Sequence, residues 1–231
     1  MTAVTSKPNE PRGARRKRET RSRLLKAAMT LMAVRGKDSV SINELTDAAD
    51  VGFGSFYNHF KSKDDIYNAL MAEVFNEFGI AIEEANKVND DPADIISFAV
   101  QCVLLRSKVN PLWGQFLLRT AFSVETIVGG MGQYMLKDLE RGVSEKRFVV
   151  SDPLMSFVSV GSTVMGAISI QHNLASQSEI VTALAEHAGY NVTNIPQRTA
   201  ATVLQILGIN EEEANVIASK PLLDVDFVAL P

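Results

Sequence analysis

Residues 51–66 read VGFGSFYNHFKSKDDI and place four aromatic rings within eight positions, between glycines and a run of charged residues. A buried segment would hide most of its rings, but here they are interleaved with small, polar and charged residues. On a helix, Phe56 and Phe60 lie one turn apart and point inward together, which leaves Phe53 and Tyr57 on or near the outer face. We therefore expect two rings to hold this helix in place and two to contact a partner.

Signals for the start of a helix flank this stretch on both sides. The residues SINE at 41–44 form a capping-box pattern, in which the Ser41 hydroxyl accepts a hydrogen bond from a free helix amide and Glu44 reaches back. The residues SKDD at 62–65 repeat this pattern at the start of a fourth helix, which we expect to continue to about Lys87. Two short helices joined by a tight, glycine-containing turn and braced by a first helix form a helix-turn-helix.

The remainder of the chain also has the periodicity of helices, so we expect an all-α protein. A first helix from Arg15 ends at Gly36, a residue typical of helix C-termini. The segment PADIISFAVQCVLLRSKV at 92–109 is apolar on almost every side, which predicts a deeply buried helix. We find no internal repeat and no sustained strand alternation. Further helices are expected near 111–122, 124–145, 153–175, 179–188, 196–208 and 211–219.

The charge of the chain differs between its two ends. Residues 1–65 carry 13 Lys and Arg against 8 Asp and Glu, whereas residues 66–231 carry 10 against 19. Although the whole chain has a net charge of −4, a basic head on an acidic body indicates that only the head meets a polyanion. We expect a disordered basic tail at 1–14, a helix-turn-helix DNA-binding domain at 15–66 and a helical effector-binding and dimerisation domain at 67–231.

Residue types that would indicate catalysis, a cofactor or export are sparse. Cys102 is the single cysteine, which rules out a disulfide within the chain and favours a reducing, cytoplasmic compartment. The residues GGMG at 129–132 lack a preceding strand and a lysine, so they do not form a phosphate loop. The uncharged run between Asp152 and Glu179 contains Ser, Thr and Gly and is interpreted as a buried helix, not a membrane span. We expect no enzymatic activity, no cofactor, no metal site and no membrane association.

The segment SINELTDAADVGFGSFYNHFKSKDDI resembles the DNA-binding module of the tetracycline-repressor (TetR/AcrR) family of bacterial transcriptional regulators, over about residues 20–70. It has a hydroxyl residue at the start of helix two, an alanine-containing helix and a Gly-Val-type turn. A recognition helix similar to T-x-Y-x-H-F and an x-S-K sequence before helix four follow. The resemblance implies a homodimer on a near-palindromic operator in double-stranded DNA, a helical ligand-binding body and repression relieved by a small-molecule effector.

By the same resemblance, residues of this module receive roles toward DNA. The second short helix would lie in the major groove, where phosphate contacts position it and base contacts specify the sequence. The ring of Phe53 departs from the family pattern, which has a small hydroxyl residue or a polar one at this position, and a contact with a thymine methyl is one use for it. Backbone contacts are expected from Ser41, Ser55, Tyr57, His59 and Lys63, and base-edge contacts from Phe53, Gly54 and Asn58.

Rings and methionines at helical spacing in the body either form ordinary core or line a ligand cavity. The small residues around Gly161 and Gly166 pack closely either within the subunit or across a dimer. The leading hypothesis is a ligand-responsive dimeric repressor with an apolar or amphipathic effector. The alternative keeps the DNA-binding head but makes the body a dimerisation or partner-binding scaffold without an effector. The candidate cavity walls are Trp113, Phe116, Phe122, Tyr134, Met135 and Met165.

Overall fold

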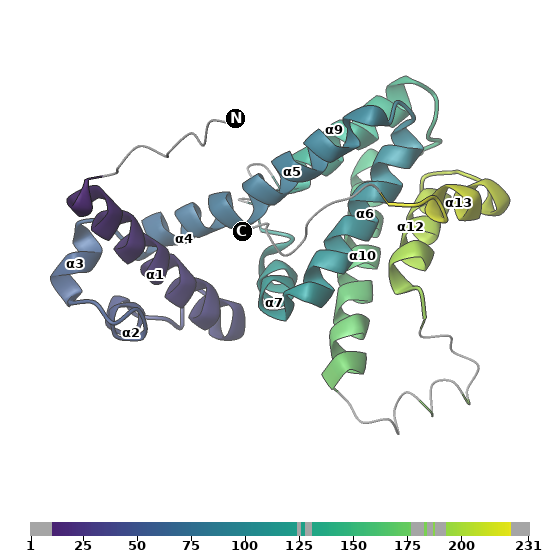
Figure 1. Ribbon diagram of the computed structural model, residues 1–231. Helices are drawn as coiled ribbons and strands as arrows, with labels where there is room; N and C mark the ends of the chain where they lie inside the picture. The colour runs from purple at the N-terminus through teal and green to yellow at the C-terminus, as the bar shows by residue number, and fades with distance from the viewer. Residues whose placement is uncertain are drawn as a thin grey trace, which may run out of the picture. The chain divides into compact units, whose positions relative to one another are not determined.

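The computed structural model divides into two compact units, Met1–Leu70 and Met71–Pro231. Its regular structure in the described part of the chain is helical throughout, which confirms the all-α prediction (Figure 1). The first ten residues of the expected basic tail and most of the helix expected at 179–188 lie outside the described residues. The structure describes residues 11–123, 126–127, 131–176, 183, 187 and 193–222, with the backbone alone at 76–77 and 175–176.

Four helices make up the first unit and the join to the second: α1 (Arg12–Arg35), α2 (Ile42–Ala48), α3 (Phe53–Tyr57) and α4 (Lys63–Met71). α1 begins at Arg12, three residues before the expected start, directly after Pro11, whose fixed φ suits the entry to a helix. It ends at Gly36, which has a φ of 81°, a conformation that glycine adopts without strain. The core of this unit includes the buried side chains of Leu24, Met32, Leu45, Phe56 and Ile66.

Both helix starts predicted from the sequence are confirmed. The Glu44 amide donates to the Ser41 hydroxyl at 3.3 Å, and the Ser41 amide donates to the Glu44 carboxylate at 2.8 Å. At the start of α4 the Asp65 amide donates to the Ser62 hydroxyl at 3.1 Å, and the amide before Ser62 donates back to the Asp65 carboxylate at 2.8 Å. Because these caps satisfy amides that would otherwise lack partners, they fix where the two helices begin.

The second unit is built around α6 (Pro92–Val109), which is buried along most of its length as predicted. Five helices pack against it: α7 (Pro111–Thr120), α9 (Met131–Ser144), α10 (Pro153–Ser176), α12 (Ile195–Ile206) and α13 (Glu211–Ala218) (Figure 1). Two consecutive residues explain why α6 starts where it does: the Asp91 side chain caps the helix, and Pro92 occupies its first turn.

The prediction of one continuous α-helix from Lys63 to about Lys87 is wrong, because the helix is interrupted by a π-helical turn. After α4 the backbone forms a π-helical turn, η1 (Ala72–Asn76), then α5 (Glu77–Ala85) and a short 3₁₀ turn, η2 (Asn86–Val88). A π-helical turn shifts the backbone hydrogen bonds to the residue five positions on and widens the helix. Within this turn the Val74 carbonyl accepts a hydrogen bond from the indole N–H of Trp113 at 3.3 Å. A distant tryptophan contacts this irregular turn, and no local sequence pattern contains that information.

α10 has two different faces. Val160, Val164 and Ile168 are buried in the core of the second unit, whereas Met155 and Ile170 are exposed on the other side. Residues 153–174 have the length and mean hydropathy of a membrane-spanning helix. Only 22% of the most apolar 18 residues of this segment are buried within this chain. A mostly buried core helix of a soluble protein also has this length and composition, but α10 is buried on one side only, so the expectation of a buried helix holds for that side alone. The exposed face of α10 is therefore available for a contact outside the chain.

Candidate nucleic-acid interface and ligand cavity

The rings of the quoted stretch divide as the sequence predicted. Phe56 is fully buried and Phe60 is 3% exposed, and the two rings pack with their centroids 5.8 Å apart. Phe53 and Tyr57 are 51% and 50% exposed and meet edge to face at 5.4 Å. Two exposed rings in contact with each other form a rigid apolar patch on the outer face of α3.

The start of α3 is set by the turn and not by Phe53. Gly52 is the N-cap residue and provides no side-chain hydrogen bond, so Phe53 becomes the first helical residue. A Cβ atom added at Gly54 would meet no atom within 4 Å, which leaves the surface beside it open for close approach. Asn58 is exposed at the C-cap. These three residues are therefore accessible to a partner.

Lys63 and His59 lie beside this face in different surroundings. The Lys63 ammonium is half-buried at the start of α4 and donates to the Asp38 carbonyl at 3.2 Å. His59 is half-buried, and its Nδ1 atom has no hydrogen-bond partner in the described structure. Burial, reinforced by Lys17 and Arg21, holds the pKa of His59 below its ordinary value. The imidazole is thus kept neutral, as a hydrogen-bonding group and not a cation.

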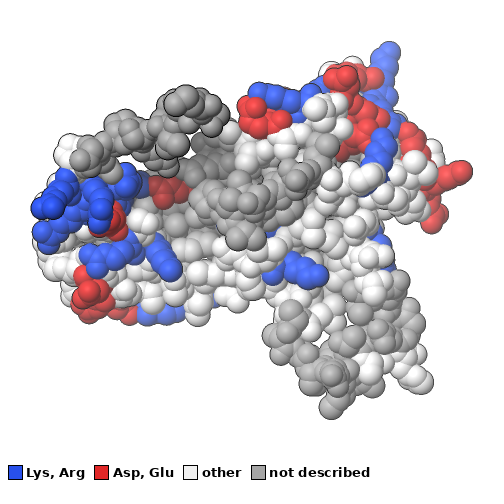
Figure 2. Space-filling model, in the orientation of Figure 1, with Lys and Arg blue, Asp and Glu red and all other residues white. Residues whose placement is uncertain are grey.

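Basic side chains gather on α1 (Figure 2). Arg21 lies over the Phe60 ring at 5.5 Å, so this positive charge reaches the end of the helix-turn-helix. Arg15 forms an exposed ion pair with Glu19 at 2.9 Å, a contact that contributes little in water. A shallow concavity lies along the first half of α1. Its basic lining residues are Arg12, Arg15, Arg16, Arg18 and Arg23.

A cavity of about 340 Å³ lies in the second unit among α5, α6, α9 and α10. Four of the six candidate wall residues line it, namely Phe122, Tyr134, Met135 and Met165. Gly161 also lines it, and a Cβ at this glycine would come within 3.1 Å of the Phe122 ring. The small residues were expected to pack either within the subunit or across a dimer, and Gly161 packs within the subunit.

Trp113 and Phe116 do not line the cavity, so this part of the expectation is wrong. Each is 1% exposed, and they pack in an aromatic cluster with Phe75 and Phe78. The Phe75 and Phe116 rings stack at 5.6 Å, and Phe75 meets the Trp113 ring edge to face at 5.8 Å. Trp113, Phe116 and Phe75 are packed inside this cluster, and only Phe78 of the four rings also borders the cavity.

One end of the cavity carries charged residues that sequence reasoning missed. Asp138 lines the cavity from α9, and the charges of Lys137, Glu83 and Arg141 act on it. Burial raises the pKa of the Asp138 carboxyl to about 6, and the negative charge of Glu83 adds to this shift. Lys137 forms an ion pair with Glu83. The signal in the sequence is the helical spacing of Met131, Tyr134, Met135 and Asp138, which places one carboxylate on an otherwise apolar stripe.

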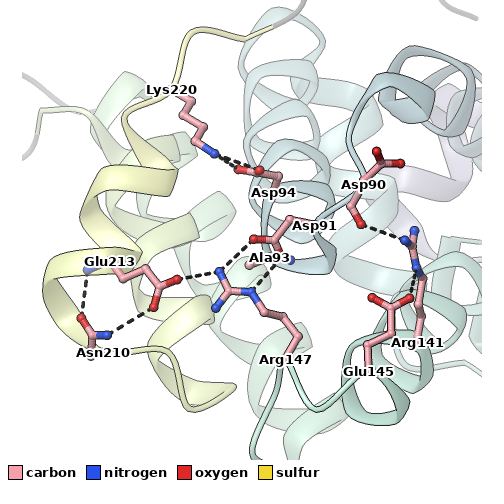
Figure 3. Close-up of polar contacts among 10 residues, drawn as sticks. All are labelled: Asp90, Asp91, Ala93, Asp94, Arg141, Glu145, Arg147, Asn210, Glu213 and Lys220. Atoms are coloured by element: carbon pink, nitrogen blue, oxygen red, sulfur yellow. Dashed lines mark hydrogen bonds and ion pairs between the residues drawn. The ribbon is translucent and has the colours of Figure 1, made fainter.

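Ion pairs beside this end tie the helices together (Figure 3). The Arg147 guanidinium binds both oxygens of Asp91 at 2.8 and 2.9 Å and also contacts Glu213 at 2.7 Å. These carboxylates raise the pKa of Arg147 above its ordinary value, with the Asp91 hydrogen bond the largest cause. Arg141 donates to the Asp90 carbonyl and to Glu145, both at 2.7 Å. The start of α6 is thereby fixed to α9 and to α13.

Comparison with known proteins gives consistent matches over both units. Residues 24–70 match the model of "Bacterial regulatory proteins, tetR family", and residues 91–220 match "Tetracyclin repressor-like, C-terminal domain". The chain is 28% identical over 113 residues to the HTH-type transcriptional regulator TcmR of Streptomyces glaucescens and 29% identical over 114 residues to AcrR of Shigella flexneri. These alignments cover 48% and 49% of this chain, and 50% and 53% of those relatives. This chain thus spans about half the length of these curated relatives.

Solved structures resemble the fold over most of the chain. The crystal structure of RolR in complex with resorcinol is 27% identical, with a TM-score of 0.64, and the match covers 92% of this chain and 100% of that one. FadR from Bacillus subtilis in complex with stearoyl-CoA has a TM-score of 0.59 at 16% identity, covering 82% and 99%, a likeness of fold alone. The described geometry and these matches agree on a DNA-binding head and a helical body.

Proposed function

This chain belongs to the tetR family of bacterial regulatory proteins, and from that premise we propose that it is a dimeric transcriptional repressor that a small effector releases from its operator. The observation that carries the proposal is the cavity of about 340 Å³ in the second unit. A body that only dimerises or docks a partner would fill this space, because protein cores pack closely. The scaffold alternative is therefore disfavoured. The protein would act in the cytoplasm.

The first unit would bind double-stranded DNA through α3 and the helix starts on either side of it. Exposure supports these roles, because Phe53, Gly54 and Asn58 are all accessible on α3 or at its end. They would face base edges in the major groove, where an asparagine amide can bind adenine and an apolar ring can contact a thymine methyl. Phosphates would be bound by Ser41, Ser55, Tyr57, His59 and Lys63.

The exposed face of α10 would pack against a second copy of the chain. Met155 and Ile170 are 53% and 56% exposed, and Ser162 and Gly166 lie between them on the same stripe. Large apolar side chains separated by small residues on an uncharged helix face are typical of a surface that packs against another protein. Twofold pairing would also present two recognition helices to a near-palindromic operator, at a spacing of about 34–36 Å for half-sites one turn apart.

The effector would occupy the cavity, and resorcinol is the first ligand to test. RolR, whose crystal structure contains resorcinol, is 27% identical to this chain, and the match covers 92% of this chain and all of RolR. The cavity lies at the lower end of the range of about 300–1,000 Å³ that ligand pockets span, so a compact effector fits and a large one does not. The effector must bind the DNA-incompetent state more tightly, because equal affinity for both states shifts nothing.

The test begins with selection of bound DNA from a random pool by the full-length protein. The selected operator is then titrated with protein in the absence of effector and at saturating resorcinol. We expect a two-fold symmetric consensus and a loss of operator affinity of about 5- to 150-fold, the usual range of allosteric coupling. A cavity ligand that binds tightly but leaves operator affinity unchanged would favour the scaffold alternative, in which the cavity has no regulatory role.

A further inference from the structure

We propose that Asp138 is the polar anchor of the cavity, and that the effector is a compact, uncharged molecule with an apolar body and a hydroxyl group that donates a hydrogen bond to the Asp138 carboxylate. This inference rests on the proposed effector-binding function and names the chemical class of ligand. It starts from the position of the carboxylate on α9. Met131, Tyr134 and Met135 share the cavity-facing stripe with it, one helical turn away or two.

The cations near Asp138 are already committed to other groups. Lys137 pairs with Glu83 on α5, and Arg141 donates to Glu145 and to the Asp90 carbonyl. Asp138 itself forms no hydrogen bond or ion pair with any residue in the part of the chain that the structure describes. A carboxylate that lines a cavity and lacks an internal partner leaves its acceptor oxygens available to a ligand.

The aromatic walls of the cavity favour a ring or another flat apolar body. The Tyr134 ring lies against the backbone of α5 at Gly79, where an added Cβ would approach it to 2.4 Å. Phe122 lies in the same way over Gly161, at 3.1 Å from an added Cβ. Phe78 and Phe157 complete the aromatic part of the lining. Such walls recognise apolar surface, and the number of polar groups that fix a ligand's orientation in a pocket of this kind is small.

Charge decides between the ligand types that could reach Asp138. A carboxylate ligand would bring a further negative charge beside Asp138 and Glu83, while Lys137 and Arg141 already bind other acceptors, so the cost of keeping all of the carboxylates ionised would rise. An ammonium ligand would lose its hydration against mostly apolar walls, and that loss offsets much of the attraction to the carboxylate. A hydroxyl group costs less to bury and donates one hydrogen bond to a charged acceptor, which is among the stronger hydrogen bonds in proteins.

The ionisation behaviour of Asp138 agrees with this assignment. Burial in the cavity wall is the largest cause that raises the pKa of Asp138 to about 6, as expected for a carboxylate with few donors around it. The charged groups that act on it are Lys137 and Arg141 on its own helix and Glu83 on α5, and Lys87 and Asp90 also line the cavity. A donated hydroxyl would stabilise the ionised form, so ligand binding should weaken as the pH falls below about 6.

The test uses pairs of probes that differ by one hydroxyl replaced with a methyl group: phenol and toluene, resorcinol and m-xylene, 1-naphthol and 1-methylnaphthalene. Benzylamine and benzoate test the two charges. Calorimetric titrations compare the full-length protein with Asp138→Leu, Asp138→Asn and the control Glu140→Gln, which removes an exposed carboxylate two residues along α9, outside the cavity lining. Circular dichroism verifies that each variant is folded, and the asparagine variant keeps the shape of the side chain if the leucine variant does not fold.

We expect the hydroxyl member of at least one pair to bind about 10- to 100-fold more tightly than its methyl counterpart to the wild-type protein. Asp138→Leu should abolish that preference, Asp138→Asn should reduce it and Glu140→Gln should leave it intact. Equal affinity within every pair, no binding of any hydroxyl probe, or tighter binding of benzylamine or benzoate would overturn the proposal. Operator titration without any probe separates this failure from failure of the proposed function, because binding of the operator by the unliganded protein does not depend on which probe the cavity accepts.

Discussion

Two carboxylates, one in each unit, have opposite surroundings. Glu44 accepts hydrogen bonds from Arg35 at 2.7 Å and from the amide and hydroxyl of Ser41, both at 2.8 Å. These donors lower the pKa of Glu44 to about 2, with the Arg35 hydrogen bond the largest cause. Asp138 has no such donor among the described residues, and burial raises its pKa to about 6. A carboxylate that organises a helix is satisfied from within the chain, whereas one that lines a cavity is left for a ligand.

Aromatic rings show the same contrast. Phe56 is buried under α3, while Phe53 and Tyr57 on its outer face are about half exposed. In the second unit, Trp113 packs in a closed aromatic cluster, while Tyr134 lines the cavity. In both units, fully buried rings build the scaffold, and rings that stay exposed at the surface or line the cavity lie where another molecule can bind.

The largest effect should separate the two kinds of ring on α3. Phe56→Ala removes a fully buried ring and should lower the free energy of unfolding by about 3–5 kcal/mol. Phe53→Ala removes an exposed ring and should change it by less than about 0.5 kcal/mol while weakening operator binding. Denaturant unfolding and operator titration measure the two effects. If Phe53→Ala destabilises the protein as strongly as Phe56→Ala, the exposed ring is part of the scaffold and the contrast fails.

Much of this contrast in the first unit could be predicted because its causes are local. The capping residues Ser41 and Glu44 are three positions apart, and Phe56 and Phe60 are one helical turn apart, so the sequence contains the geometry. The departure at Phe53 was visible in the same way, although only the structure shows that Gly52 caps the helix.

The cavity depends on contacts between distant segments, and prediction there was partial. Trp113 and Tyr134 are both aromatic residues on helices, and only the packing of α5 and α6 decides which one meets open space. Asp138 was missed because a charged residue within a helix ordinarily faces solvent, so its place on an apolar stripe was not given weight. The π-helical turn at η1 has no sequence signature, and its carbonyl contact comes from Trp113, 39 positions away.

The exposed face of α10 is the proposed contact between two copies of the chain. Ile170→Glu would place a charge in the proposed dimer interface twice, once from each copy, at a cost of about 1–3 kcal/mol for each buried polar group. The variant should be monomeric or weakly associated in light scattering at micromolar concentration. Val216→Glu is the matched control, because Val216 is 62% exposed on α13 and outside the α10 stripe. If the wild-type protein is monomeric under these conditions, the prediction of a homodimer through α10 is wrong.

Asn58→Ala tests whether the exposed end of α3 reads bases. Loss of a bidentate amide contact should relax the preference at one base step in each half-site by about 1–3 kcal/mol. Selection of bound DNA from a random pool, repeated with the variant, measures the change. An identical consensus for the wild type and the variant would remove Asn58 from the base-reading set and leave Phe53 and Gly54 to account for sequence preference.

Lys63→Ala should have a smaller and different effect, because its expected partner is a phosphate. Affinity should fall about uniformly across DNA sequences, and the dependence of log affinity on log salt should flatten by about one unit. Lys108→Ala on α6, in the second unit, is the control for loss of a positive charge elsewhere. An unchanged salt dependence together with unchanged affinity would mean that Lys63 serves only its contact with the Asp38 carbonyl.

The smallest expected effect tests the two carboxylates directly, through the pH dependence of stability. Glu44 has a pKa lowered from 4.5 to about 2, so its contribution is present above pH 4.5 and disappears as the pH falls toward 2. Asp138 has a pKa raised from 3.8 to about 6, so the folded state binds its proton more tightly than the unfolded state does. Its ionisation therefore costs stability, and the cost grows as the pH rises from about 4 to about 6.

Melting temperatures of Glu44→Gln and Asp138→Asn between pH 3 and pH 8 should consequently diverge from the wild type in opposite directions. Glu44→Gln should melt lower at pH 7, with the deficit shrinking below pH 4.5, and the change should be modest because the group is exposed and screened. Asp138→Asn should match the wild type near pH 4 and melt higher above pH 6, since asparagine cannot ionise. If Asp138→Asn follows the wild-type profile throughout, the carboxylate is well solvated, and the contrast between a satisfied carboxylate and one left for a ligand no longer holds.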